Sequence, residues 1–402
     1  MQTGRRRVAL IVTVVAGVLV IALAMAEFVA CGNGNDKSAP TTFTAPHDTK
    51  AAQPTTPPPT LPPTTVGQLP REVFPPRPWR TGFNGVLSTL LDDAALARDT
   101  AAMAATGARW LRADFYWAII QGGGPESYDW TSADRVVQAA TSRGMEVLAL
   151  AAYSPEWARP PGTSDHHPPL DPDAYAKFLY QAAKRYAPLG VHAWEIWNEP
   201  NVDTFWQPRP DPASYAAMLQ RAYVALKSAD PKAVVITGGL APGLDTSDGK
   251  TLSAHTFLSR VYDAGAGGSF DAVGLHPYSF PAMPLDAKDW NTFYNAPTLY
   301  QVMVDHGDAK KRIWGTEYGA STSGPGSVSD AFQSDVVRDG YRVWLSWPFT
   351  GPLLIYVYRD YANNPSDREA NFGLVQHDGT PKPAFATFEA IVRDLEVRQR
   401  PR

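Results

Sequence analysis

The sequence has 402 residues, a length that accommodates one large domain with appended segments. Its 36 lysines and arginines are balanced by 40 aspartates and glutamates, and the longest basic block is Arg5-Arg6-Arg7, which argues against a nucleic-acid-binding protein. The one cysteine, Cys31, excludes an internal disulfide, so the fold must depend on its hydrophobic core.

The amino terminus is predicted to be a membrane anchor. A basic flank, residues 1–7, precedes an uncharged apolar run over residues 8–26. A helix of this length spans about 28 Å, close to the hydrocarbon thickness of a bilayer. The basic flank is expected to stay in the cytoplasm, with everything after the run outside the membrane. The run is longer than the apolar region of a cleaved secretory signal, which favours an uncleaved signal anchor.

A lipoprotein signal is the alternative interpretation of the same segment. Phe28-Val29-Ala30-Cys31 resembles a bacterial lipoprotein cleavage box, which makes Cys31 a candidate lipidation site. The box departs from the usual pattern because its first position is Phe rather than Leu and Glu27 precedes it. Either interpretation places the remainder of the chain outside the cytoplasmic membrane.

Residues 27–73 are predicted to be a disordered linker. They are rich in Thr, Pro, Ser and Ala and show no hydrophobic periodicity, so they cannot bury enough surface to fold. At roughly 3.1 Å per residue in polyproline geometry, about 40 residues reach at most ~120 Å. A tether of that length would carry a folded domain into a surrounding envelope layer.

Residues 74–402 are predicted to form a (β/α)₈ barrel, because short apolar runs alternate with amphipathic helical patterns. Strands are expected near 81–86, 108–113, 145–152, 191–197, 232–237, 270–275, 311–316 and 353–358. Helices are expected near 93–106, 131–143, 172–187, 211–229, 251–264, 296–308, 329–346 and 382–396. An open doubly wound sheet is the second possibility. No glycine-rich phosphate-binding motif follows the first strand, and no cofactor is expected.

The fourth predicted strand ends in an unusual group of polar side chains. The stretch VHAWEIWNEPN, residues 191–201, has apolar residues on both faces, as in a buried parallel strand. Asn198 and Glu199 follow, and Pro200 favours the end of the strand. Barrel enzymes keep their chemistry at the carboxyl ends of strands. We therefore predict that Glu199 is functional rather than a helix cap or a surface ion pair.

The string Trp197-Asn198-Glu199-Pro200 resembles the acid/base signature of the clan A retaining glycoside hydrolases. Together with Ile313-Trp314-Gly315-Thr316-Glu317-Tyr318-Gly319, it is most similar to family 39 and to its neighbour, family 5. The resemblance covers roughly residues 78–395. It implies that Glu199 is the general acid/base, that Glu317 is the nucleophile, and that a covalent glycosyl-enzyme forms between them.

Other strand ends supply candidate substrate-binding residues. Arg112 and Tyr278 match clan positions that donate hydrogen bonds to the nucleophile, and Asn198 is expected to bind the 2-hydroxyl of the sugar. His276 lies at the sixth strand end, where a core histidine is the alternative. Aromatic candidates for substrate subsites are Trp117, Trp157, Trp206 and Tyr358.

Other acidic and histidine residues of the sequence are weaker candidates for the site. Glu195 is expected to point into the barrel and to be paired there, because the period-2 alternation of a strand places it on the same face as Glu199. Glu156 lies on a rim loop and is a weaker substitute acid. Asp165-His166-His167 only superficially resembles a metal cluster, since adjacent histidines do not readily converge on one ion, and no metal site is expected.

The sequence thus predicts a membrane-tethered, extracytoplasmic O-glycosyl hydrolase, expected as a monomer. Its expected substrate is a β-linked polysaccharide or glycoconjugate of the cell envelope, and no nucleic-acid partner is expected. A catalytically silent carbohydrate-binding or scaffold protein on the same barrel remains the alternative, as does a transglycosylase that uses the same residues.

Overall fold

The computed structural model describes residues 80–86 and 88–399. The predicted cytoplasmic flank, anchor, lipidation site and linker all lie within residues 1–79, outside this part of the chain. Among the described helices, none combines the length and the apolar character needed to cross a bilayer.

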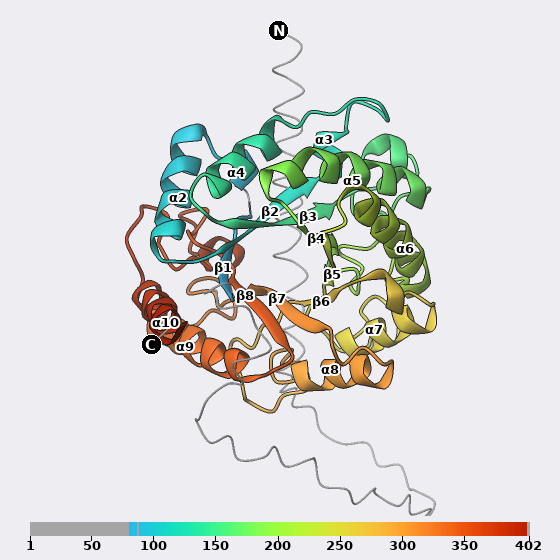
Figure 1. Ribbon diagram of the computed structural model, residues 1–402. Coiled ribbons are helices and arrows are strands. Elements are labelled where there is room, and N and C mark those ends of the chain that lie inside the picture. Colours follow the sequence, from blue (N-terminus) through green and yellow to red (C-terminus); the bar gives the residue numbers. More distant parts are fainter. Residues whose placement is uncertain (1–79, 87, 400–402) are drawn as a thin grey trace, which may run out of the picture.

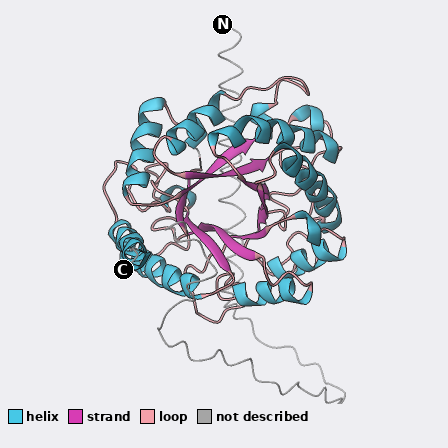
Figure 2. Ribbon diagram, in the orientation of Figure 1, coloured by secondary structure: helices cyan, strands magenta, loops and turns pink. Residues whose placement is uncertain are grey.

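Eight parallel strands close into a barrel (Figures 1 and 2). They are β1 (Thr81–Asn84), β2 (Trp110–Tyr116), β3 (Glu146–Ala152), β4 (Ala193–Asn198), β5 (Val234–Gly239), β6 (Ala272–Leu275), β7 (Arg312–Tyr318) and β8 (Thr350–Ile355). Each strand pairs with the next in the sequence, and the barrel closes where Gly82 of β1 lies opposite Leu354 of β8. This closure confirms the predicted (β/α)₈ barrel and excludes the open doubly wound sheet.

A ring of helices covers the outside of the barrel (Figure 2). The helices are α2 (Asp93–Ala105), α3 (Trp117–Ile120), α4 (Thr131–Thr141), α5 (Pro172–Tyr186), α6 (Pro212–Ala229), α7 (Ala254–Asp263), α8 (Ala296–Asp305), α9 (Asp330–Ser346) and α10 (Pro383–Gln399). The Asp171 and Asp211 side chains accept backbone N–H bonds at the starts of α5 and α6, each followed by a proline at the first helical position. These caps confirm the starts that the sequence predicts.

The interior of the barrel is filled by one tight apolar layer. Its members are Trp110, Leu148, Ala193, Ile236, Ala272, Trp314 and Leu354. The rings of Trp110 and Trp314 meet edge to face with centroids 5.1 Å apart, a geometry that the ring quadrupoles favour. Gly82 makes room for this layer, because a Cβ atom there would lie 2.5 Å from the Cβ of Trp110 and 2.7 Å from Leu354.

The eighth strand differs from the prediction. It spans Thr350–Ile355 rather than 353–358, so Tyr356 and Tyr358 follow the strand instead of ending it. The sequence pattern does not indicate a strand start at Thr350, because Gly351 and Pro352 are both unfavourable inside a strand. The register against β7 shifts between Ile313 and Gly315, opposite this stretch, and again between Gly315 and Tyr318.

We expect Gly82→Ala to lower the free energy of unfolding by about 1–3 kcal/mol, because the added methyl group overpacks the barrel interior. Gly268→Ala is the matched control, since a Cβ there meets nothing within 4 Å, and its effect should stay within about 0.5 kcal/mol. Urea unfolding monitored by tryptophan fluorescence measures both. Equal stability of the two variants would contradict the packing assigned to Gly82.

Candidate active site

The carboxyl ends of β4, β6 and β7, together with Arg112 from within β2, bring the predicted polar residues together. Glu199 Oε1 lies 2.7 Å from His276 Nδ1, and the same nitrogen lies 3.5 Å from Glu317 Oε2. One ligand atom each of Glu199, His276 and Glu317 can be chosen so that all three lie within 4.8 Å of one another. Two carboxyl groups 118 residues apart in the sequence (317 − 199) therefore meet at one point of the barrel mouth.

Glu199 is delivered by a strained strand end. Trp197 and Glu199 both have positive φ angles, 71° and 46°, a region that costs a non-glycine residue about 1–3 kcal/mol. Surrounding contacts hold this conformation: the Trp197 indole N–H donates to the carbonyl oxygen of Phe205 at 2.7 Å, and Glu199 N–H donates to Gly239 O at 3.0 Å. The turn directs the Glu199 carboxyl group out of the strand alternation and into the cleft.

Burial raises the pKa of Glu199 to about 8, although Arg112 opposes this shift. Only 10% of the Glu199 side chain is exposed, and Tyr153 and Phe205 line the cleft beside it. Desolvation disfavours the charged carboxylate, so Glu199 is protonated at neutral pH. This is the protonation state that a general acid requires.

Glu317 lies in a richer hydrogen-bonding environment. Its Oε1 accepts hydrogen bonds from Arg112 Nη1 at 2.7 Å and Asn84 Nδ2 at 3.0 Å, and its Oε2 accepts one from the Tyr278 hydroxyl at 3.0 Å. Burial raises the pKa of Glu317, whereas His276, Arg112 and Tyr278 lower it. Because these donors stabilise a carboxylate, Glu317 is the member of the pair that carries the negative charge.

Arg112 is the buried centre of this arrangement. Its guanidinium group donates to Glu195 at 2.5 Å, to Glu317 at 2.7 Å and to Asn198 Oδ1 at 2.8 Å. Glu195 is fully buried and also accepts hydrogen bonds from Gly239 N and the Thr316 hydroxyl, each at 2.8 Å. This confirms the prediction that Glu195 points inward and is paired. Arg112 also fixes the Asn198 carboxamide, which lines the cleft.

His276 is a neutral hydrogen-bond donor between the two carboxyl groups. Burial lowers its pKa to about 4. Its Nε2 has no hydrogen-bond partner among the described residues and lies against Gly239, where a Cβ atom would come within 2.2 Å. The ring proton therefore belongs on Nδ1, which faces Glu199 and Glu317. His276 thus belongs to the site and is more than a core histidine.

Further residues surround the cleft, whose cavity has a volume of about 40 Å³. Asp114, Tyr116, Tyr153 and Tyr356 lie at or just after predicted strand ends, whereas the sequence did not indicate Val86, Leu150, Phe205, Glu369 or Asn84, which lies beneath Glu317. Asn84 could have been found, because an amide side chain near the end of the first predicted strand points to the rim. Glu369 gave no such signal, since it lies in an irregular segment after β8.

Glu369 is a further carboxyl group at the cleft. It is 1% exposed, its Oε2 has no hydrogen-bond partner within the described part of the chain, and its Oε1 lies 3.4 Å from Arg368 Nε. Burial raises the pKa of Glu369 to about 7, partly opposed by Arg368. A buried carboxyl oxygen without a donor is costly, and a hydroxyl-bearing ligand in the cleft would supply one.

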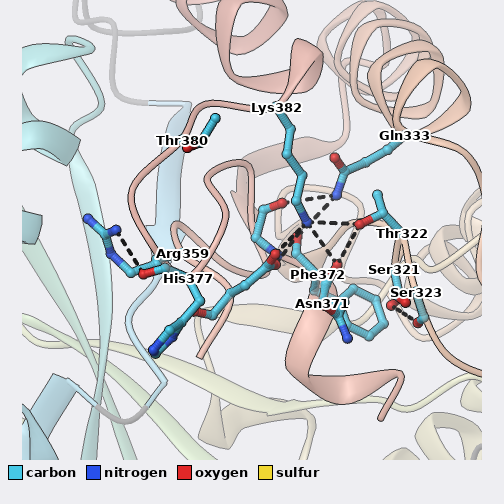
Figure 3. A network of polar contacts seen from close by, with 12 residues as sticks. Ser321, Thr322, Ser323, Gln333, Arg359, Asn371, Phe372, His377, Thr380 and Lys382 are labelled. Atoms are coloured by element: carbon cyan, nitrogen blue, oxygen red, sulfur yellow. Dashed lines mark hydrogen bonds and ion pairs between the residues drawn. The ribbon is translucent and has the colours of Figure 1, made fainter. Parts of the chain in front are cut away.

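A polar network holds the segment that carries Glu369 (Figure 3). The buried Lys382 ammonium donates to Asp360 Oδ1 at 2.9 Å, to Thr322 Oγ1 at 2.9 Å and to Asn371 O at 3.2 Å. Gln333 of α9 donates to three carbonyl oxygens, including those of the two residues after Asn371. These contacts join the segment after β8 to the segment after β7 and keep Glu369 at a defined position.

Two of the four predicted aromatic subsites are corrected by the structure. Trp117 is fully buried against Phe178 and Tyr175, and Trp206 is 1% exposed between Trp197 and Tyr215. Neither indole offers a face that a sugar could reach. Both tryptophans instead pack in the layer between strands and helices.

The other two aromatic candidates lie apart from the cleft lining. Trp157 is partly exposed, and its indole N–H donates to Gln121 O at 2.7 Å, which fixes the ring on the rim. Tyr358 is 8% exposed and packs on Phe83 and beneath the Arg359 guanidinium group. A subsite role for Trp157 remains a prediction, whereas the packing of Tyr358 argues for a structural role.

Two groups of residues contain potential metal ligands. Glu199, His276 and Glu317 form a group of potential ligands, but the same atoms already make the hydrogen bonds described above. His166 Nδ1 lies 2.7 Å from the Thr204 carbonyl oxygen, and its ring packs on Tyr153 and Phe205. The His166 ring therefore supports Tyr153 and Phe205, which line the cleft, and is not itself part of the lining.

Comparison with known proteins identifies the family. Residues 81–338 match the family model described as cellulase (glycosyl hydrolase family 5). None of the curated proteins compared with the sequence matches it. Solved structures do resemble the fold, at sequence identities that establish the fold alone.

Three of these structures illustrate the likeness. A family 39 glycoside hydrolase from the gut symbiont Bacteroides cellulosilyticus WH2 is 21% identical with a TM-score of 0.66, covering 80% of this chain and 64% of that one. A monomeric β-xylosidase from Caulobacter crescentus CB15 is 18% identical with a TM-score of 0.59, covering 78% and 67%. A variant of a family 5 enzyme from Streptomyces cattleya, in complex with Manβ1-4GlcNAc, is 15% identical with a TM-score of 0.61, covering 78% and 80%. The chain thus spans just under two thirds of the Bacteroides structure.

We expect Glu199→Gln to stabilise the fold, by about 1–3 kcal/mol at pH 8 and by less at pH 5. The folded protein holds the Glu199 proton up to about pH 8, whereas the unfolded chain releases it near the ordinary glutamate pKa. At pH values between these two pKa values, unfolding releases a proton, so the free energy of unfolding of the wild type falls as the pH rises. The glutamine side chain does not titrate, so the variant does not lose this stability. Urea unfolding at both pH values measures the effect. The exposed Glu156→Gln variant is the control, and an equal gain at both pH values would contradict the burial of Glu199.

Proposed function

The chain belongs to the cellulase family, glycosyl hydrolase family 5, and we propose that it hydrolyses O-glycosidic bonds by double displacement with retention of configuration. The close approach of Glu199 and Glu317 carries this proposal. Their oxygen atoms lie within 4.8 Å, which supports direct attack by one carboxylate. Retaining enzymes hold the pair at about 5–5.5 Å, whereas inverting enzymes need about 6.5–9.5 Å to admit a water molecule.

In the first step, Glu199 protonates the leaving oxygen while Glu317 attacks the anomeric carbon. The C–O bond to the leaving group breaks as the bond to Glu317 forms, and the proton moves from Glu199 to the departing hydroxyl. In the second step, Glu199, now a carboxylate, takes a proton from water, and the water oxygen displaces Glu317 from the sugar. Protonated Glu199 and ionised Glu317 are the states that their environments favour.

The surrounding donors support the same mechanism. Arg112, Asn84 and Tyr278 hold the Glu317 carboxylate in a single orientation, which lowers the entropic cost of attack. The Asn198 amide nitrogen is available to the 2-hydroxyl of the sugar, because Arg112 binds the amide oxygen. This contact is expected to strengthen as the oxocarbenium-like transition state forms.

Replacing the nucleophile should abolish turnover while sugar binding survives. For Glu317→Gln we expect less than a thousandth of wild-type kcat, because the amide cannot form the glycosyl ester, and glycan affinity measured by calorimetry should stay within about tenfold. Asp305→Asn, an exposed carboxylate at the end of α8 and outside the catalytic cleft, is the control. Retention of a tenth of wild-type activity would refute the assignment of Glu317.

Trapping with an activated 2-fluoroglycoside should label Glu317. The fluorine slows hydrolysis of the intermediate, so the protein mass increases by one glycosyl group and peptide mapping locates the ester. A catalytically silent carbohydrate-binding protein would bind the sugar without being labelled. Product analysis with added acceptor alcohols separates hydrolysis from transglycosylation, which uses the same residues.

The activity should fall above about pH 8, as Glu199 loses its proton. Glu199→Gln should lose roughly 10²–10⁴-fold in kcat/KM with an alkyl glycoside and far less with a dinitrophenyl glycoside, whose leaving group needs no proton. The pH profile of kcat/KM with both substrates tests this. Equal losses with the two leaving groups would remove Glu199 from the acid role.

The proposed substrate is a β-linked polysaccharide or glycoconjugate of the cell envelope. The related structures are named for β-xylosidase, β-mannosidase and glucosidase activities, which favours β-linked sugars without selecting one. The proposed anchor at residues 8–26 and the linker at residues 27–73 would place the domain near the envelope. Activity of the full chain on purified cell-wall glycans tests the proposal, and action only on soluble disaccharides would count against it.

A further inference from the structure

We infer that a second cavity on the rim binds an additional sugar residue of the glycan chain, with the Trp290 indole as its stacking platform. The cavity has a volume of about 250 Å³ and lies between the segments that follow β5 and β6. Helices α7 and α8, which begin beside it, lie next to each other on the outside of the barrel (Figure 1). The inference rests on the proposed function for the class of ligand, a glycan. The position of the site follows from the cavity itself.

The cavity lies beside the catalytic cleft. Leu275, the last residue of β6, lines it, and the next residue, His276, binds Glu199 on the other side of the strand end. Ala241 also lines it, and its backbone is hydrogen-bonded to the side chain of Asn201, two residues after Glu199. The two cavities therefore flank the end of β6 on the carboxyl face of the barrel.

Trp290 differs from the other tryptophans of the described chain. Each of the others contacts an aromatic ring or belongs to an apolar core cluster, whereas half-buried Trp290 does neither. Its indole N–H has no hydrogen-bond partner within residues 80–86 and 88–399. A half-buried indole without a ring partner retains both an apolar surface and a hydrogen-bond donor for a ligand.

The segment that presents Trp290 is rigid. The fully buried Asn291 donates from its amide nitrogen to the carbonyl oxygens of Met283, Pro284 and Asp286, at 3.1, 3.3 and 2.9 Å. This ties the preceding residues into a compact turn. The position of Trp290 is thus set before any ligand arrives, which reduces the entropy lost on binding.

The polar groups around Trp290 suit a sugar. Asn295 donates from its amide nitrogen to Asp289 O at 2.8 Å, and this contact orients its side-chain oxygen Oδ1, which accepts no hydrogen bond from the described residues. Exposed Thr298 and His255 add hydroxyl and imidazole groups, while Leu275 and Leu299 form an apolar floor. A pyranose ring presents C–H groups on one face and hydroxyls at its edge, which matches an indole face beside a few polar atoms. The Asp289 carboxylate favours a neutral sugar over an anionic one.

The test compares Trp290→Ala, Trp290→Phe and the control Tyr294→Ala in the full-length chain. Tyr294 is a 42% exposed aromatic residue of the same segment that does not line the cavity. The probes are β-1,4-linked gluco-, xylo- and manno-oligosaccharides of two to six units, and the nitrophenyl glycoside of each single sugar. We expect Trp290→Ala to raise KM for the longer oligosaccharides about tenfold with unchanged kcat, and to leave the nitrophenyl glycosides unaffected. Trp290→Phe should restore most of the loss.

Direct binding separates this inference from the proposed catalytic function. In a Glu317→Gln background, hexasaccharide affinity measured by calorimetry should fall about tenfold on adding Trp290→Ala and stay unchanged on adding Tyr294→Ala. That difference supports the second site even if the wild-type chain hydrolyses none of the probes, an outcome that would refute the proposed function alone. The inference would be overturned if the proteins with and without Trp290 bound the hexasaccharide equally well, or if neither protein bound it.

Discussion

The buried guanidinium group of Arg112 is the interaction on which the barrel mouth depends. It joins β2 to Glu195 and Asn198 of β4 and to Glu317 of β7 with contacts of 2.5–2.8 Å. A buried cation is costly unless its charge is paired and its donors are satisfied, and here two carboxylates and an amide meet that condition. The same contacts orient the residues that face the substrate, so the stability of the rim and its chemistry cannot be separated.

Different surroundings give the two central carboxyl groups different properties. Glu317 has three hydrogen-bond donors, whereas Glu199 has apolar and aromatic neighbours and a neutral histidine. Desolvation favours the protonated form of Glu199, and directed donors favour the ionised form of Glu317, which suits the proposed acid and nucleophile roles. The positive φ angles of Trp197 and Glu199 show that the fold tolerates backbone strain to reach this arrangement.

The segments after the strands extend the site in two directions. The segment after β8, held by the buried Lys382, brings Glu369 into the cleft that Glu199 and Glu317 line, and the segments after β5 and β6 enclose the cavity beside Trp290. A rigid strand cylinder with variable rim segments allows substrate recognition to change without altering the catalytic residues. On this view the barrel would supply the reaction and the rim would decide how much of a glycan is held.

The sequence by itself determined the order of strands and helices, the helix caps at Asp171 and Asp211, and the strand ends that carry Asn198, Glu199, His276 and Glu317. It also placed Arg112 on the second strand, although that strand extends beyond the predicted end to Tyr116. Hydrophobic periodicity and capping are local properties, and in a closed parallel barrel all strand ends meet at one face. Only the tertiary structure decided that Trp117 and Trp206 are core residues, that Glu369 joins the cleft, and that Trp290 stands without a ring partner. Burial and distance depend on contacts between segments far apart in the chain, which no local pattern records.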